Sequence, residues 1–182
     1  MTAPIEFYEK TAPFYEFSNF YMSPKMKINI DGFDWISTEQ YFQAAKFYIP
    51  ESERHMEYFR IIQSTDSPMK CMYVARQKKK GGYAGKWLVN KLTDKRSLNE
   101  VIEKYQDLAI RADWDDVRND VMYTALVAKF TKNEYLKKLL TGTGDADIIE
   151  ASPRDDYWGW GKNKDGQNML GKLLMKCRDD MP

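Results

Sequence analysis

The sequence predicts an α+β fold, a mostly helical single domain with a small antiparallel sheet near the N-terminus. Short runs of alternating aromatic and polar character occupy residues 1–36. Apolar residues then recur at helical spacing through most of 38–178. The chain contains no internal repeat, linker or low-complexity segment, and its length suits one core, so we expect a single domain over residues 1–182.

The predicted sheet lies in the N-terminal part, where aromatic and polar residues alternate over 14–21. A second run, over 27–30, leads into Asp31-Gly32. An Asp-Gly pair between alternating runs is typical of a β-hairpin. We therefore expect short antiparallel strands joined by loops before residue 36.

Helical spacing predicts the remaining elements in order. The first helix is expected over about 38–48, because Pro50 disfavours its continuation. A second is expected over about 52–62, and Ser67-Pro68 opens a third, since proline is tolerated at a first helical position. Later helices are expected in this order: two within about 97–130, one over about 133–140 and one over about 167–178.

Composition narrows the classes of function. With 43% hydrophobic and 14% aromatic residues the chain can form a packed core. The 28 lysines and arginines nearly balance the 27 acidic residues, so no overall charge draws the protein to nucleic acid or membrane. Cys71 and Cys177 lie in separate segments and suit free thiols in a reducing compartment. Without a signal sequence or a membrane-spanning apolar run, we expect a soluble, cytoplasmic protein.

One segment, residues 76–96, is strongly basic and contains Asp94 as its only acidic residue. Such a segment can contact phosphate or a nucleic-acid backbone, and the alternative is a solvated loop. The run 81–87 is not a phosphate-binding loop, because its glycine spacing differs and no serine or threonine follows Lys86.

The leading catalytic candidate is Glu39. Ser37 and Gln40 match a capping box, which makes Glu39 the second residue of its helix. The positive end of the helix dipole favours an ionised carboxylate there unless burial opposes it. Gln43 and Lys46 follow on the same helical face and complete a polar stripe that could line a cleft. The alternative is an amphipathic helix with a solvated polar face.

Several chemistries lack the residues they need. The single histidine, His55, has no second ligand at metal spacing and no nucleophile motif pointing to it. Residues 163–166 resemble the middle of a calcium loop, but Gly161 and Lys172 stand where acidic ligands belong. No glycine-rich dinucleotide fingerprint is present. We therefore expect neither a metal nor an organic cofactor.

Carboxylates, aromatic surfaces and a glycine-containing loop remain, and they favour glycosidic chemistry. Breaking a glycosidic bond develops an oxocarbenium-like sugar, which one carboxylate can stabilise while a second handles protons. Glu39 and Asp155 are candidates for that pair. Trp114, Trp158 or Trp160 could stack on a leaving base, and the alternative for each tryptophan is burial in the core.

A series of motifs in the same order resembles the YbiA/NADAR family over nearly the whole chain. The segment from Thr38 to Phe47 is similar to the family pattern T-x-E-H-Y-x-Q-x-x-K-F, with Gln40 in place of the commoner histidine. The other matching blocks are Phe17-Ser18-Asn19-Phe20, Ser67-Pro68, Trp114 through Phe130, Asp155 through Gly161 and Gly166 through Gly171. So many blocks in the same order are improbable by chance.

The resemblance implies hydrolysis of a C–N bond between ribose and a heterocycle or amine. Family substrates include phosphoribosylamino-pyrimidine intermediates of riboflavin synthesis and ADP-ribose attached to guanine bases. The family's functional residues fall on Glu39, Trp114 and Asp155, with the adjacent Asp156 as the other option for the aspartate. Glu39 would stabilise or trap the ribosyl cation, Trp114 would pack against base or ribose, and Asp155 would orient water or a ribose hydroxyl. The implied substrate-binding residues are Ser18, Asn19, Gln43, Lys46, Trp158, Gly159 and Asn168.

The substrate class and two alternatives to an enzyme stay open. The stretch from Arg76 to Trp114 is longer than in compact bacterial members, and its basic cluster would suit ADP-ribosylated nucleic acid better than a small phosphoribosyl metabolite. A non-catalytic module that binds ADP-ribose or a nucleotide would use the same aromatic surfaces. A nucleic-acid-associated protein would use residues 76–96. The sequence makes no prediction of oligomeric state.

Overall fold

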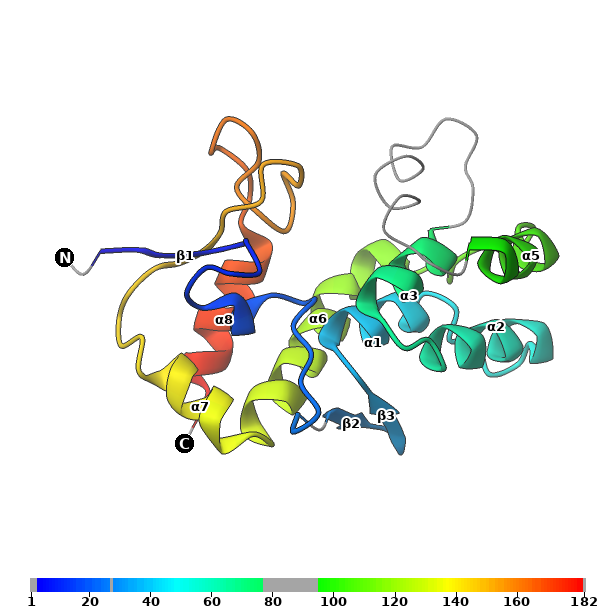
Figure 1. Cartoon of the computed structure of the whole chain (residues 1–182), viewed down its shortest axis with the longest axis horizontal. Helices are drawn as coiled ribbons and strands as arrows, with labels where there is room; N and C mark the ends of the chain where they lie inside the picture. Colours follow the sequence, from blue (N-terminus) through cyan, green and yellow to red (C-terminus); the bar gives the residue numbers. More distant parts are fainter. Residues whose placement is uncertain (1–2, 27, 77–94, 182) are drawn as a thin grey trace. The chain divides into compact units, whose positions relative to one another are not determined.

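The computed structural model describes residues 3–26, 28–76 and 95–181. It is mostly helical, with short strands in pairs (Figure 1), so the predicted α+β fold is confirmed. Its contacts divide the chain into two compact units, which we call unit 1 (Met1–Asp34 and Met122–Pro182) and unit 2 (Trp35–Val121). The helix α6, Trp114–Thr131, begins in unit 2 and ends in unit 1.

Unit 1 brings together the two ends of the described chain. The strand β1, Ile5–Phe7, pairs in parallel with β4, Ile148–Glu150. Unit 1 also contains the 3-10 helix η1 (Tyr15–Phe17), β2 (Ile28–Ile30), α7 (Glu134–Thr141) and α8 (Met169–Asp179). α8 packs against β4 and α7. The sequence did not predict the β1–β4 pair, because no turn signal joins two short strands that lie far apart along the chain.

Phe17 is the centre of the aromatic core of unit 1. Its side chain is fully buried, and its ring lies 5.8 Å from that of Phe7 and 5.9 Å from that of Phe130. The alternation over 14–21 suggested a strand, but the structure has a 3-10 turn there, entered through Phe14 at a φ of 61°. That strand prediction is wrong, because the short turn places Phe17 inward between aromatic rings.

The predicted hairpin is present. β2 pairs with β3, Phe33–Trp35, across Asp31 and Gly32, whose φ angles are 52° and 82°. Two successive positive φ angles are those of the tight turn that fits the twist of antiparallel strands. Asn29 Nδ2 also donates to Asp34 Oδ1 at 2.7 Å, across the hairpin.

Unit 2 is built from helices that begin at serine caps. Ser37 caps α1 (Thr38–Ala45), Ser52 caps α2 (Glu53–Gln63) and Ser67 caps α3 (Pro68–Ala75). In each case the serine Oγ accepts a backbone N–H of the first turn, which satisfies a donor that the helix itself leaves open. α5, Lys95–Tyr105, follows, and α1 packs against α2 and α3. These starts confirm the predicted helices.

Gln40 joins α1 to the end of α2. It is fully buried, and its Nε2 donates to the carbonyls of Gln63 and Thr65, both at 2.8 Å. Its Oε1 accepts the N–H of Ile36 at 3.0 Å. The capping box predicted a bond to the N–H of Ser37, so the side chain reaches one residue further back than expected. Gln40 is thereby occupied in holding the fold.

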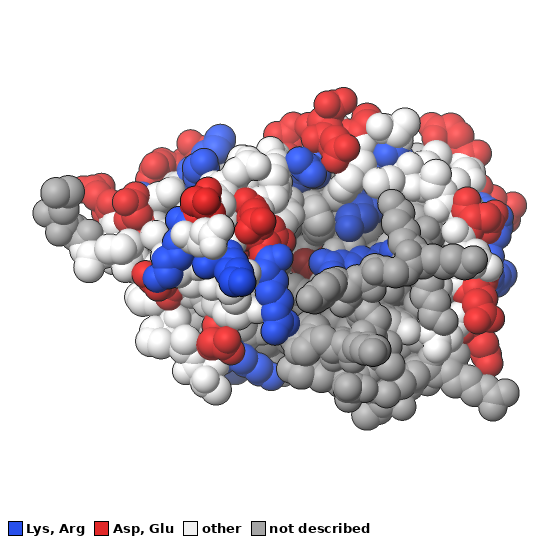
Figure 2. Space-filling model, turned by 90° about the horizontal axis from the view of Figure 1, so that it is seen from above, with Lys and Arg blue, Asp and Glu red and all other residues white. Residues whose placement is uncertain are grey.

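The remaining sequence predictions have mixed outcomes. Cys71 and Cys177 are free thiols, as expected, and both are buried. Of the basic segment 76–96, residues 77–94 lie outside the described residues, so its nucleic-acid contacts stay a prediction. Side chains of both charges occur on the described part of the face in Figure 2. None of the described helices is long and apolar enough to cross a membrane.

We predict that Gln40→Ala lowers the free energy of unfolding by about 2–4 kcal/mol, because buried backbone groups lose their partners. Urea unfolding of both proteins measures the difference. The matched control is Gln106→Ala, at an exposed position of unit 2, which we expect to change stability by less than about 0.5 kcal/mol. Equal effects of the two substitutions would contradict the joining role of Gln40.

Candidate functional site

A chain of hydrogen bonds runs along one face of α1. Gln43 Nε2 donates to Glu39 Oε1 at 2.7 Å, and Lys46 Nζ donates to Gln43 Oε1 at 2.7 Å. Glu39 and Gln43 are 6% and 3% exposed. Residues four and three apart share a helical face, which is why the predicted polar stripe forms these contacts. Glu39 and Gln43 are therefore buried and bonded, and Lys46 is half-buried, so the solvated polar face considered as the alternative is wrong.

The groups at the two ends of this chain, the Lys46 ammonium and the Glu39 carboxylate, determine which atoms of the Gln43 amide donate and accept. An ammonium group can only donate, so Lys46 turns the oxygen of the Gln43 amide toward itself. The amide nitrogen then points to Glu39, whose carboxylate accepts. The Gln43 amide thus links a positive and a negative group. The arrangement holds Glu39 in one orientation.

Lys46 lies among aromatic rings as well as beside this amide. Its Nζ is 5.3 Å from the ring centroid of Phe42 and 5.7 Å from that of Trp114. Burial lowers the pKa of Lys46 to about 8, while Glu39 raises it and Arg76 lowers it further. At neutral pH the ammonium form prevails, but it loses its proton at lower pH than an ordinary lysine.

Trp114 stands at the start of α6. Its side chain is 6% exposed, and its ring meets that of Phe42 at 4.9 Å in an edge-to-face arrangement. The Trp114 indole is therefore buried in the core, which was the alternative to stacking on a base. Its contact with a base stays a prediction. Four of the predicted site residues, Glu39, Gln43, Lys46 and Trp114, come together in unit 2 with Phe42. We call these five residues the α1 cluster.

The remaining candidates belong to unit 1. Asp155 lies in the segment between β4 and α8, where its Oδ1 accepts the N–H groups of Tyr157 at 3.0 Å and Trp158 at 2.7 Å. Asp155 is half-buried, whereas Asp156 is exposed and its carboxylate fills the space beside Gly161. The two aspartates therefore differ. Asp155 orders the backbone that carries Trp158, which is itself half-buried.

Asn168 and Gly159 make close contacts with β4. The Asn168 side chain accepts the N–H of Glu150 at 2.9 Å and donates to the carbonyl of Ile148 at 2.8 Å. These two bonds pair it with the strand much as a neighbouring backbone would. A Cβ on Gly159 would lie 2.8 Å from the Glu150 carbonyl oxygen. Both residues thus have structural roles, and contact with a substrate stays a prediction for each.

Ser18 and Asn19 are each 7% exposed and follow η1 directly. Ser18 Oγ accepts the N–H of Phe20 at 3.1 Å. The backbone carbonyl of Ser18 accepts a hydrogen bond from Lys129 Nζ at 2.9 Å. This segment is therefore held from α6 by a lysine that no sequence pattern singled out.

Lys129 is fully buried, and its Nζ lies 5.4 Å from the ring centroid of Tyr21 and 5.1 Å from that of Phe130. Burial lowers the pKa of Lys129 to about 7, and Glu16 raises it in part. Lysine side chains are usually exposed, so the position of Lys129 beside an apolar stripe did not by itself predict that its side chain is buried. The feature that could have indicated burial of Lys129 is its uncharged sequence neighbours, Ala125 through Ala128 before it and Phe130 after it.

Comparison with known proteins agrees with the sequence motifs. A family model for the NADAR domain matches residues 6–182. N-glycosidase YbiA of Escherichia coli strain K12 is 32% identical over 97% of this chain and 88% of that protein. N-glycosidase Npun_R5314 of Nostoc punctiforme is 30% identical over 97% of this chain and 92% of that protein.

Two further matches concern a plant protein and a solved structure. The chloroplastic riboflavin biosynthesis protein PYRR of Zea mays is 31% identical over 97% of this chain, which spans 25% of that protein. The NMR structure of the E. coli protein YbiA matches with a TM-score of 0.71 and 31% identity, covering 97% of this chain and 83% of that chain. The likeness thus extends to the fold.

Lys129 generates a prediction about pH. Between its folded pKa of about 7 and its ordinary value of 10.5, the unfolded chain binds a proton that the folded protein does not. The free energy of unfolding therefore rises with pH in this window, by up to about 1.4 kcal/mol per pH unit. From pH 7.5 to 9 we expect it to rise by about 1–2 kcal/mol more in the wild type than in Lys129→Met. Urea unfolding at both pH values measures this.

The control for this experiment is Lys132→Met, which replaces an exposed lysine. Its unfolding free energy should follow the pH dependence of the wild type. Identical pH dependence of the wild type and Lys129→Met would show that the Lys129 side chain is charged in the folded protein throughout this range.

Proposed function

The chain belongs to the NADAR family, and we propose that it is an N-glycosidase whose catalytic carboxylate is Glu39. It would hydrolyse the C–N bond between the ribose of a phosphoribosyl or ADP-ribosyl group and a heterocyclic base or amine. The observation that carries this proposal is the buried, oriented carboxylate of Glu39 at the end of the α1 hydrogen-bond chain. The names of the relatives support the reaction class.

The reaction requires stabilisation of positive charge on C1′ of the ribose. As the C1′–N bond breaks, its electron pair leaves with the nitrogen, which takes up a proton, and a water oxygen bonds to C1′. A carboxylate that accepts hydrogen bonds and carries negative charge suits the developing cation. Gln43 donates a hydrogen bond to Glu39, the contact that a carboxylate oxygen accepts.

Lys46 and Trp114 would bind the two ends of such a substrate. The Lys46 ammonium is a point charge suited to a phosphate group, and the rings of Trp114 and Phe42 beside it offer an aromatic wall for ribose or base. Asp155 keeps the role that the family resemblance implies for it, to orient water or a ribose hydroxyl. Ser18 and Asn19 stay candidates for substrate contact.

We favour a small phosphoribosylamino-pyrimidine as the substrate class, because the Zea mays relative is named for riboflavin biosynthesis. ADP-ribosylated guanine in nucleic acid is the second candidate, and the basic residues of 76–96 are its support. The two buried free thiols, Cys71 and Cys177, suit the reducing cytoplasm, where we expect the enzyme to act.

We predict that Glu39→Gln lowers turnover by at least about 100- to 1,000-fold, because it removes the charge that stabilises the transition state. Mass spectrometry would follow release of ribose phosphate from a phosphoribosylamino-pyrimidine and of ADP-ribose from an oligonucleotide carrying ADP-ribosyl-guanine. The substrate that the wild type cleaves distinguishes the two candidate classes. Circular dichroism and thermal unfolding would verify that the variant is folded.

The matched control is Glu103→Gln, which makes the same charge change at an exposed position of unit 2. Its turnover should equal that of the wild type. Undiminished turnover of Glu39→Gln would remove Glu39 from the mechanism. Saturable nucleotide binding by the wild type with no cleavage of either substrate would instead favour the non-catalytic binding module.

The pKa of Lys46 leads to a second prediction. Because burial lowers this pKa to about 8, the ammonium deprotonates as the pH rises through 8. If it binds the substrate phosphate, KM should rise about tenfold from pH 7 to 9, with a smaller change in kcat. In Lys46→Arg the side chain stays charged, and the rise should disappear. A wild-type KM that is constant over this range would exclude the phosphate contact.

A further inference from the structure

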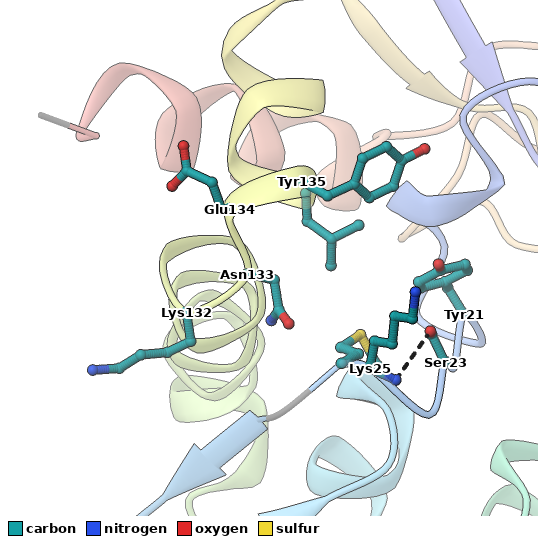
Figure 3. A pocket seen from close by; sticks show the side chains of 9 residues that line it. Tyr21, Ser23, Lys25, Lys132, Asn133, Glu134 and Tyr135 are labelled. Carbon is teal, nitrogen blue, oxygen red and sulfur yellow. Dashed lines mark hydrogen bonds between the residues drawn. The ribbon is translucent and has the colours of Figure 1, made fainter.

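Unit 1 contains a cavity that none of the candidate residues lines. It lies between the loop 21–26 and the start of α7 and has a volume of about 520 Å³ (Figure 3). Small-molecule sites commonly measure about 300–1,000 Å³. Its side chains are both polar and apolar, with Met26 and Leu136, 8% and 2% exposed, among them.

Lys25 supplies positive charge to this cavity. Its side chain is exposed, runs beside Tyr21 in Figure 3, and forms no ion pair with any residue in the described part of the chain. The one acidic residue in the lining, Glu134, points away from Lys25 in that view and pairs with Lys138 at 3.3 Å. The Lys25 ammonium is therefore available to an anion. The positive end of the α7 dipole adds to its field.

Two tyrosine rings line the same cavity and are held in place by contacts outside it. Tyr135 is 61% exposed, and its hydroxyl donates to Glu16 Oε1 at 3.0 Å. The ring of Tyr21 packs edge-to-face on Tyr15 at 6.2 Å, and Lys129 Nζ lies 5.4 Å from its centroid. A large exposed ring that is already fixed loses little entropy when a second ring stacks on it.

We propose that this cavity binds a small anionic aromatic molecule of the size of a nucleoside monophosphate. The phosphate would contact Lys25, and the base would stack on Tyr135 over the apolar side chains of Met26 and Leu136. A single lysine acts as a point charge and so suits a phosphate monoester. The site shares no residue with the α1 cluster, so the proposal does not depend on N-glycosidase activity.

The test is a titration with adenosine 5′-monophosphate, followed by the amide NMR signals of the full chain. The signals of residues 25–26 and 133–136 should shift in a saturable manner. Lys25→Gln should weaken binding about tenfold, because it removes one charge-assisted contact. Tyr135→Ala should weaken it about fivefold or more, while Tyr135→Phe, which keeps the ring but loses its bond to Glu16, should weaken it less than Tyr135→Ala does.

Three controls separate binding in this cavity from unspecific attraction of the anion and from binding at the α1 cluster. Lys162→Gln makes the same charge change at an exposed position that does not line the cavity, and it should bind as the wild type does. Glu39→Gln should leave the shifts of 133–136 unchanged, whether or not it abolishes turnover. Adenosine and inorganic phosphate, each used alone, should bind at least about tenfold more weakly than the nucleotide.

Several results would overturn the proposal. One is the absence of saturable shifts at 25–26 and 133–136. Another is an equal effect of Lys25→Gln and Lys162→Gln, which would indicate unspecific attraction of the anion. A third is adenosine binding as tightly as the nucleotide, which would remove the anion from recognition.

Discussion

Burial of a polar helix face is the constraint on which unit 2 depends. Glu39, Gln40 and Gln43 are all buried, although their side chains carry polar or charged groups. A buried polar group without a partner costs about 1–3 kcal/mol, so each must be bonded inside the protein. Gln40 meets this need through the end of α2, which fixes α1 on its neighbour. The helix is thus positioned by the same polar contacts that its burial requires.

Two lysines, the half-buried Lys46 and the fully buried Lys129, show a related compromise. Lys46 and Lys129 both lie against aromatic rings, and burial lowers the pKa of each. Aromatic faces replace part of the lost hydration of an ammonium but do not restore it. A methionine would fill either space without that cost. Their partners differ, since Lys46 bonds to a side-chain amide coupled to a carboxylate and Lys129 bonds to a backbone carbonyl.

Features that depend on residues close together in the sequence were predicted correctly. The Ser37 cap, the first-turn proline of α3 and the Asp31-Gly32 hairpin depend on residues a few positions apart, and all three were predicted from the sequence. The β1–β4 pair and the burial of Lys129 depend on segments more than 100 residues apart, and neither was predicted. The polar stripe of Glu39, Gln43 and Lys46 was predicted only in part. Its helical face was predictable, but its burial and bonding needed the neighbouring helices.

The residues of the family motifs differ in how far their structural roles explain their identity. Asn168 and Gly159 are required by the close approach of their loop to β4, so folding alone accounts for their identity. Glu39 differs, because Ser37 already caps α1 and a glutamine at position 39 could also accept the bond from Gln43. A glutamine would avoid the cost of burying a charge. The negative charge of Glu39 raises the pKa of Lys46, and it is also the feature on which the proposed catalytic role depends.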